Sequence, residues 1–199
     1  MGGIDDIGFD ASTALVVVDV QNDFADPRGS LYVDEGEQVV PVIDELVAAA
    51  GEAGALVVYT QDWHPPSTPH FREQGGVWPV HCVRDTWGSE LHPGLRVAGP
   101  VVRKAIGPEN GYSGFTARDV VTGEDRPTGL QAVLQERGVE RLVVVGLARD
   151  VCVAATALDG RRLGYPVTVL LEATRPVELN RGDDARTRAQ MAQAGVELR

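Results

Sequence analysis

Short runs of apolar residues, separated by helical patterns, are the feature that most constrains how this chain can fold. Each run is rich in Val and Leu, and none alternates cleanly between apolar and polar residues. Continuous apolar runs of this length are typical of parallel strands that are covered on both faces. The predicted strands are residues 14–18, 55–59, 100–103, 141–145 and 166–171.

The segments between these runs carry apolar residues at helical spacing, and a glycine follows each of them closely as a stop signal. The predicted helices are residues 37–50, 129–137, 151–163 and 186–194. This alternation predicts an α/β fold of three layers, with a mainly parallel central sheet flanked by helices on both faces. We expect a single domain over residues 1–199, with a long irregular excursion at 61–99 and a short hairpin within 110–126.

Charge and cysteine content narrow the class of protein. The formal net charge is −11, so a nucleic-acid partner is not expected, because an acidic surface repels phosphate backbones. No apolar stretch approaches the roughly 20 residues of a membrane span, and the first ten residues do not resemble a signal peptide. Two isolated cysteines are no disulfide framework. We therefore expect a reduced, cytoplasmic protein without a membrane partner.

Polar residues follow the predicted strands where a site is expected. Ligands of open parallel sheets bind beyond the carboxyl ends of the strands. Asp19 follows the first predicted strand, and Asp62 and His64 follow the second. Lys104 follows the 100–103 strand, and Cys152 comes shortly after 141–145. These residues should converge on one edge of the sheet.

Cys152, Lys104 and Asp19 together predict nucleophilic catalysis. Cys152 stands near the start of a predicted helix, whose N-terminus would lower the thiol pKa and aim backbone N–H groups at an oxyanion. Lys104 could stabilise the thiolate, and Asp19 could carry the proton to a leaving amine. Taken singly, each residue also fits an ordinary role: a buried small Cys, a surface lysine and an aspartate that caps a turn.

The excursion at 61–99 carries three of the four histidines, and we interpret it as metal- and substrate-binding. Asp62, His64, His70 and His81 offer the carboxylate and imidazole ligands that suit one divalent ion such as Zn, Fe or Mn. Histidines also gather in polar loops by chance. Cys82, which adjoins His81, is interpreted as a packing residue.

Four aromatic residues near these positions could sandwich a flat heteroaromatic substrate, although aromatic residues are more often core. They are Phe24, Trp63, Trp78 and Tyr112. Phe24, Trp78 and Tyr112 are the candidate substrate-binding residues, and Phe24 and Trp78 are favoured.

Five motifs, in this order along the chain, resemble the nicotinamidase branch of the isochorismatase-like cysteine hydrolases. They are VVDVQNDFADPRGSL, QDWHPPSTPHF, WPVHCVRDTWGSELHP, RKAIGPENGYSGF and GLARDVCVAATAL. The resemblance runs from about residue 14 to 171. It implies a metal-dependent amidase on the isochorismatase-like fold that hydrolyses nicotinamide to nicotinate and ammonia through a cysteine thioester, in NAD salvage. Pyrazinamide is implied as a second substrate, and a homo-oligomer as a candidate assembly.

The resemblance also implies roles for particular residues. It implies a catalytic triad of Asp19, Lys104 and Cys152, and an oxyanion hole made by the amides of Ala148 and Cys152 after a cis peptide at Leu147–Ala148. Other implied roles concern the ligands of the metal and the substrate ring. Asp62, His64 and His81 would ligate the metal, and His70 would complete the cluster directly or nearby. Phe24 and Trp78 would stack on the pyridine ring. Gln21 and Asn22 would lie near the water shell of the metal.

One departure from the family pattern bears on the substrate. Arg149 stands where the family commonly has Thr, and a guanidinium in the pocket would favour an acidic substrate. This departure keeps open an amidohydrolase that acts on another small amide, such as an N-carbamoyl or ureido compound. A non-catalytic binding or interaction protein on the same fold is the alternative outside enzymes. A hydrolase of the isochorismate vinyl ether is a weaker alternative, since that reaction needs neither Cys152 nor the metal ligands.

Overall fold

A parallel sheet forms the centre of the computed structural model, which describes residues 7–120 and 122–199. Among these residues six strands pair in the order β3-β2-β1-β6-β7-β8, and every neighbouring pair is parallel. The strands are β1 (Thr13–Val18), β2 (Leu56–Asp62), β3 (Val101–Lys104), β6 (Arg141–Leu147), β7 (Val167–Arg175) and β8 (Glu197–Leu198). All five predicted runs lie in or overlap strands, which confirms the predicted sheet; β8 is additional.

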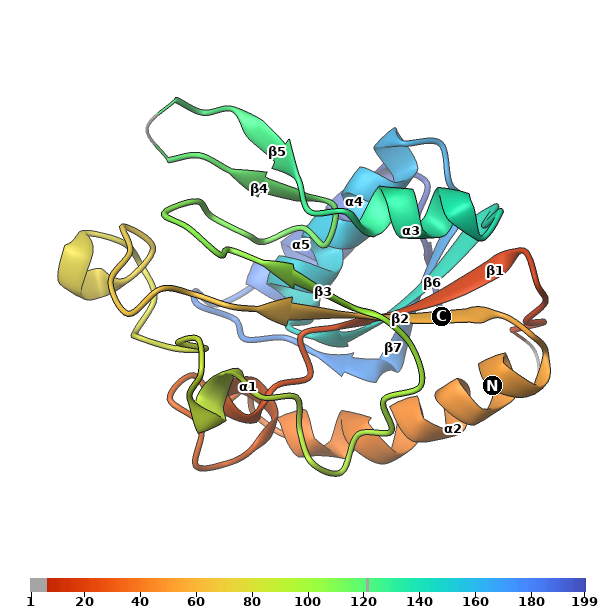
Figure 1. Ribbon diagram of the computed structural model, residues 1–199, viewed down its shortest axis with the longest axis horizontal. Coiled ribbons are helices and arrows are strands. Elements are labelled where there is room, and N and C mark those ends of the chain that lie inside the picture. The colour runs from red at the N-terminus through yellow and green to blue at the C-terminus, as the bar shows by residue number, and fades with distance from the viewer. Residues whose placement is uncertain (1–6, 121) are drawn as a thin grey trace.

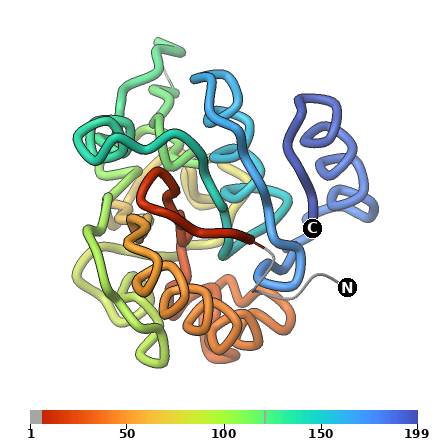
Figure 2. Tube along the Cα trace, turned by 90° about the vertical axis from the view of Figure 1, so that its right-hand side faces the viewer, coloured from red at the N-terminus to blue at the C-terminus, as the bar shows by residue number. Residues whose placement is uncertain are grey.

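Helices cover both faces of this sheet, which confirms the three-layer prediction (Figure 1). The helix α2 (Val39–Glu52) packs on one face. On the other face lie α3 (Leu130–Glu136), α4 (Ala154–Arg162) and α5 (Asp183–Gln193), with α5 beside α4 (Figure 2).

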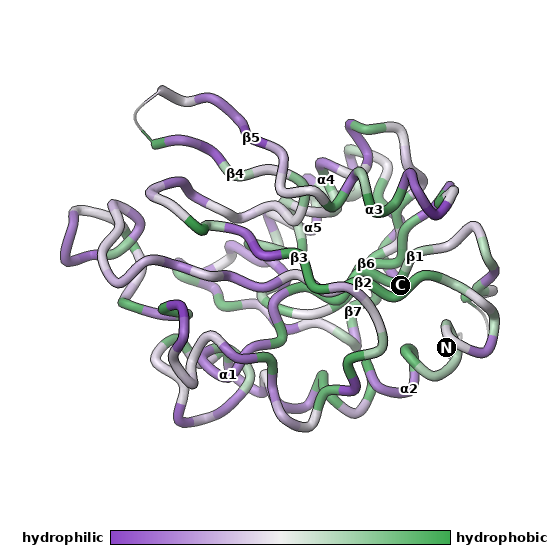
Figure 3. Tube along the Cα trace, in the orientation of Figure 1, coloured by the Kyte–Doolittle hydropathy of each residue, from purple (hydrophilic) through white to green (hydrophobic). Residues whose placement is uncertain are grey.

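Alternate residues of the strands supply two separate cores. In β1, Leu15 and Val17 pack into the cluster that contains α2, whereas Val16 and Val18 face the cluster that contains α3, α4 and α5. Successive side chains of a strand point to opposite faces, so a fully apolar strand can serve both layers. The apolar residues therefore concentrate in the middle of the molecule, while the connecting segments are largely hydrophilic (Figure 3).

The register of the sheet places the ends of several strands side by side. Asp62 and Lys104 are directly paired at the ends of β2 and β3, and Val18 pairs with Gly146 where β1 ends. At Gly146 φ is +108°, and a Cβ atom would lie 2.1 Å from the carbonyl oxygen of Val18. Only glycine fits so close an approach. The chain after β6 is thereby held against the end of β1.

The remaining elements refine the predicted boundaries. The hairpin predicted within 110–126 is present as β4 (Thr116–Arg118) and β5 (Asp125–Pro127). One π-helical turn, Arg149–Val153, precedes α4, and a short helix, α1 (Asn22–Ala25), follows β1. The helix predicted at 186–194 begins three residues earlier, at Asp183, because two aspartates in its first turn favour a helix N-terminus although they carry no apolar signal. Within the described ranges, no helix is long and apolar enough to cross a bilayer.

Candidate active site

Three buried side chains meet where β1, β3 and β6 end. The Lys104 ammonium lies 2.8 Å from Oδ2 of Asp19 and 3.7 Å from Sγ of Cys152. It also lies 2.5 Å from Oδ1 of Asp62 and donates to the carbonyl oxygen of Gly111. All four ionisable side chains are buried. The structure thus brings together the three residues that the sequence nominated for catalysis.

The charge of Lys104 is maintained by its two carboxylate neighbours. Burial alone would lower the Lys104 pKa, but the negative charges of Asp19 and Asp62 outweigh it and raise the pKa well above its ordinary value. Burial would likewise raise the pKa of Asp62, and here Lys104 prevails and holds that pKa below its ordinary value. The resting site therefore contains an ammonium and at least one carboxylate in direct contact.

Asp19 has the properties of a proton carrier. Burial raises the pKa of Asp19 to about 6, against the opposing effect of Lys104. The Thr60 hydroxyl donates to Oδ1 of Asp19 over 2.7 Å, which leaves Oδ2 on the side of Lys104. The backbone of Asp19 is left-handed, with φ at +48°, an uncommon conformation for a residue other than glycine. A carboxylate with a pKa near neutrality is well matched to accept and return a proton.

The sequence predicted a lowered pKa for Cys152, and this prediction is wrong. Burial raises the pKa of the Cys152 thiol well above its ordinary value, and Lys104 offsets this only in part, while Asp19 and Asp62 add to it. The sulfur therefore rests as a thiol, and the nucleophile has to be generated by transfer of its proton. A carboxylate oxygen of Asp19 lies within 4.8 Å of the sulfur, and Asp19 is the acceptor because Asp62, which is equally near, has a lowered pKa and is the weaker base.

A group of three histidines lies beside this cluster. One ring nitrogen of each of His64, His70 and His81 lies within 4.8 Å of the others, and all three side chains are buried. Oδ2 of Asp62 is 3.6 Å from Nε2 of His64. The structure therefore gathers the predicted metal ligands in one place.

These residues fit a divalent metal ion. Burial lowers the pKa of both His70 and His81 to about 4, so the two rings are neutral at pH 7, as metal ligation requires. Within the described chain neither ring nitrogen of His64 has a hydrogen-bond partner, although both are buried. A buried polar atom without a partner is costly, and a bound cation would satisfy it.

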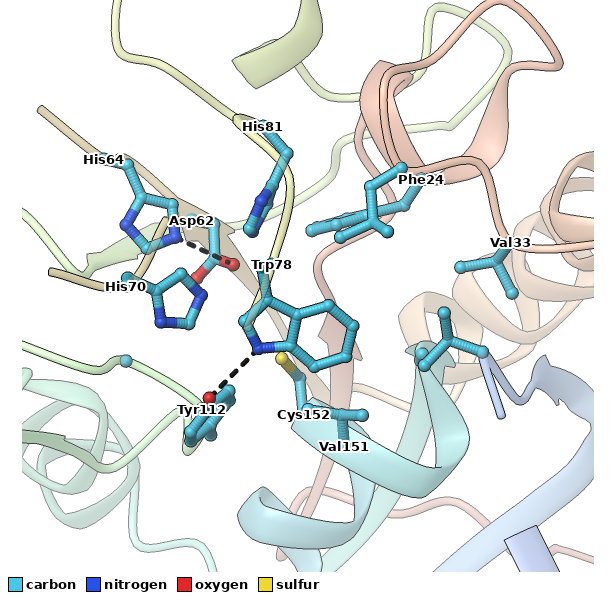
Figure 4. A pocket seen from close by; sticks show the side chains of 14 residues that line it. Phe24, Val33, Asp62, His64, His70, Trp78, His81, Tyr112, Val151 and Cys152 are labelled. Carbon is cyan, nitrogen blue, oxygen red and sulfur yellow. Dashed lines mark hydrogen bonds and ion pairs between the residues drawn. The ribbon is translucent and has the colours of Figure 1, made fainter. Parts of the chain in front are cut away.

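A pocket lined by both groups joins the histidines to Cys152 (Figure 4). Phe24, Trp78 and Tyr112 line it, as the sequence predicts, and the indole Nε1 of Trp78 donates to the Tyr112 hydroxyl over 3.0 Å. Trp63 is not part of the lining; it stacks under the Arg103 guanidinium at 3.7 Å. Four aliphatic residues that the sequence did not nominate also line the pocket: Leu31, Val33, Val151 and Val177.

The segment between β6 and Cys152 has the predicted backbone. The Leu147–Ala148 peptide is cis, which confirms that prediction, and Ala148 lines the pocket. The resemblance places Gln21 near the water shell of the metal, and this stays a prediction. Its amide donates to the carbonyl oxygen of Asp62 and accepts from the Asp62 N–H, both at 2.8 Å, so that it continues the sheet pairing beyond the end of β1. Asn22 donates to the carbonyl oxygen of Trp87.

Arg149 points away from the pocket. Its guanidinium makes two hydrogen bonds to the Asp184 carboxylate of α5, at 2.7 and 3.1 Å, and contacts the carbonyl oxygens of Leu171 and Thr174. Arg149 is absent from the pocket lining among the described residues. The departure from the family pattern therefore adds no positive charge to the site.

Comparisons with known proteins show which family the chain resembles. Residues 13–198 match the model of the isochorismatase domain. The nicotinamidase of Escherichia coli is 35% identical over 93% of this chain and 93% of its own length.

Two solved structures share the fold over nearly the whole chain. The pyrazinamidase of Pyrococcus horikoshii, in complex with zinc, has a TM-score of 0.82 and 36% identity, and covers 94% of this chain and 98% of its own. PnC1 from L. infantum, in complex with nicotinate, has a TM-score of 0.86 and 34% identity, and covers 96% and 94%. The resemblance to the nicotinamidase branch is thereby confirmed, and the chain belongs to the isochorismatase domain family.

Proposed function

We propose that this protein is a metal-dependent cysteine amidohydrolase that converts nicotinamide to nicotinate and ammonia, a reaction of NAD salvage. The observation that carries the proposal is the convergence of Asp19, Lys104 and Cys152 on one pocket with three buried histidines. The relatives support the choice of substrate, since nicotinamidases match over most of the chain and one similar structure holds nicotinate.

The reaction follows from the positions of the side chains. Asp19, as the carboxylate, accepts the proton of the Cys152 thiol, and the sulfur attacks the amide carbon. The N–H groups of Ala148 and Cys152 would hold the oxyanion, and such a donor is typically worth about 3–4 kcal/mol. Asp19 then gives the proton to the departing nitrogen, and ammonia leaves a thioester. Water, activated by Asp19, hydrolyses the thioester to nicotinate and restores the thiol.

Lys104 keeps a positive charge beside Asp19 and the sulfur throughout these steps. It stabilises the thiolate at the moment at which the proton has moved to Asp19. Phe24, Trp78 and Tyr112 would hold the flat ring, which places the carboxamide over Cys152. Asp62, His64, His70 and His81 would hold the metal, which supplies, when bound, a Lewis-acid anchor for the pyridine nitrogen.

The proposal also covers the identity of the metal, a second substrate, the domain organisation, the location and the assembly of the protein. Three imidazoles with one carboxylate suit zinc, and a similar structure contains zinc. Pyrazinamide is proposed as a second substrate because it is nearly isosteric with nicotinamide. We also propose that residues 1–199 act as one domain with 61–99 as its metal- and substrate-binding excursion, that the protein is cytoplasmic, and that it forms a homo-oligomer.

Ammonia release from nicotinamide, measured with and without a metal chelator, tests the proposal. The protein loaded with zinc should release ammonia, and removal of the metal should lower kcat/KM at least tenfold because the ring loses its anchor. Zinc added back should restore the rate, and N-carbamoyl and ureido compounds serve as comparison substrates. Failure to hydrolyse nicotinamide under these conditions would refute the proposed substrate, and a chelated protein with undiminished kcat/KM would refute the role of the metal.

Replacing Arg149 with threonine tests whether its charge selects the substrate. Because the guanidinium faces Asp184, the Arg149→Thr variant should keep its KM for nicotinamide within about twofold and gain no preference between neutral and acidic amides. Steady-state kinetics on both kinds of amide measure this. A variant that shifts from an acidic to a neutral amide would show that Arg149 reaches the pocket.

A further inference from the structure

The three consecutive residues Asn110, Gly111 and Tyr112 each contact a different part of the site. The Asn110 side chain contacts His70, the Gly111 carbonyl accepts from Lys104, and the Tyr112 hydroxyl accepts from Trp78. Gly111 and Tyr112 meet groups that already have a role in the proposed reaction. The contact between Asn110 and His70 has no role in that reaction, although His70 is a proposed metal ligand.

We propose that Asn110 is a positioning residue of the metal site, which selects the His70 tautomer that offers Nε2 to the ion. The inference rests on the proposed metal-dependent function. Oδ1 of Asn110 lies 2.7 Å from Nδ1 of His70. A carbonyl oxygen can only accept a hydrogen bond, so Nδ1 must carry the proton. The lone pair of the neutral ring is then on Nε2, the other ring nitrogen.

The same arrangement occurs at a second histidine of the group. Nδ1 of His81 lies 2.7 Å from the carbonyl oxygen of Pro79, which also can only accept. Two of the three rings are thus fixed by an oxygen on Nδ1, and in His81 the oxygen comes from the backbone. Asn110 is therefore the one side chain in the described residues that performs this task, and the one that a substitution can remove. Oxygen acceptors behind metal-bound histidines fix the ring and increase its basicity.

Asn110 is itself held in place by the backbone. Its N–H donates to the carbonyl oxygen of Arg118 over 2.8 Å, and its carbonyl oxygen accepts from the Arg118 N–H over 2.7 Å. Arg118 is the last residue of β4, so the hairpin supports Asn110 from outside the pocket. A side chain on a fixed backbone can hold the ring of His70 with little further loss of entropy. The hairpin thereby gains a role in the metal site.

A simpler explanation of the contact is loop closure. The His70–Asn110 and Trp78–Tyr112 hydrogen bonds both join the 61–99 excursion to the segment before β4. If Asn110 served only to hold these segments together, the loss of either bond would have a similar effect on the metal. If Asn110 selects a tautomer, only the loss of its own oxygen would weaken binding.

The test measures the affinity of the full-length, metal-free protein for Zn²⁺ by competition with a chromogenic chelator. Asn110→Leu removes the acceptor at similar size and should weaken zinc binding about 10- to 100-fold. Asn110→Asp keeps an oxygen acceptor and should bind zinc at least as tightly as the unaltered protein. Glu109→Gln, at the neighbouring position, and Tyr112→Phe, which loses the other bond between the segments, should leave the zinc affinity unchanged.

Three results would overturn the inference: an unchanged zinc affinity in Asn110→Leu, an equal loss in Tyr112→Phe, or an equal loss in Asn110→Asp. Thermal melting of the metal-free variants shows that they are folded, and Asn110→Ala replaces the leucine variant if that one does not fold. The titration needs no substrate. A protein that binds zinc in this manner but leaves nicotinamide intact would refute the proposed function and support the role of Asn110.

Discussion

Replacing Cys152 with alanine should lower the release of ammonia from nicotinamide by a factor of roughly 10⁴ or more. Loss of the nucleophile from a hydrolase of this type removes the covalent route altogether, and only the binding and oxyanion contributions remain. The side chain is small and lines the pocket, so its loss should leave the fold and the zinc affinity intact. The measurement is kcat with zinc-loaded protein, beside a thermal melt and a zinc titration.

Cys82 provides the matched control for this variant. It is the only other cysteine, it is also buried, and it does not line the pocket. Cys82→Ala should therefore retain most of the activity, with a modest loss of stability from the small cavity. Turnover of Cys152→Ala at a rate close to that of Cys82→Ala would exclude a thioester at Cys152.

The convergence of the catalytic residues could be predicted because it depends on backbone rules alone. Buried parallel strands end at one edge of a sheet, so Asp19, Asp62 and Lys104 had to lie near one another once the strands were recognised. The alternation of an extended chain also separates Asp62 and His64, which face the site, from Trp63, which faces the solvent side and stacks on Arg103.

The electrostatic state of the site could not be predicted in the same way. The position of Cys152 near a helix start suggested a lowered pKa, but the outcome depends on how deeply the sulfur is buried and on two carboxylates supplied by other strands. The direction of Arg149 was equally open, since its partner Asp184 lies 35 residues later on another helix. Both questions concern contacts between segments that the local pattern does not specify.

Replacing Lys104 with methionine should lower the free energy of unfolding by about 3–5 kcal/mol at pH 7.5. The methionine side chain approximates the shape of the lysine stem but leaves Asp19 and Asp62 buried without their cation. Uncompensated buried charges of this kind cost several kcal/mol. Arg103→Met on the same strand is the control, because the exposed guanidinium only stacks on Trp63 and donates one hydrogen bond to Gln61 over 3.3 Å, so that its loss should cost less than about 1 kcal/mol. Urea denaturation of the metal-free proteins measures both.

The loss of unfolding free energy in the Lys104→Met variant should become smaller as the pH falls. In the unaltered protein the lowered pKa of Asp62 contributes stability above its unfolded value near 4, and that contribution is lost on acidification. Asp19, with its pKa raised to about 6, contributes in the opposite sense. Its contribution to the free energy of unfolding is fully present below about pH 4 and is lost as the pH rises through 6. Without the ammonium, burial raises the pKa of both carboxyls, so the variant is least stable at high pH and recovers as they take up protons. A deficit that is constant between pH 7.5 and pH 5 would show that Lys104 stabilises the fold by packing.

The composition of the chain allows the charge of Lys104 to be observed directly. Lys104 is the only lysine among the 199 residues, so protein labelled with isotopic lysine gives one side-chain signal by NMR. Because Asp19 and Asp62 together raise its pKa well above the ordinary value, this signal should remain that of an ammonium as far as the folded protein can be titrated. Deprotonation below pH 10 would mean that burial outweighs the two carboxylates. Lys104 could then neither stabilise a thiolate nor balance the charge of Asp62.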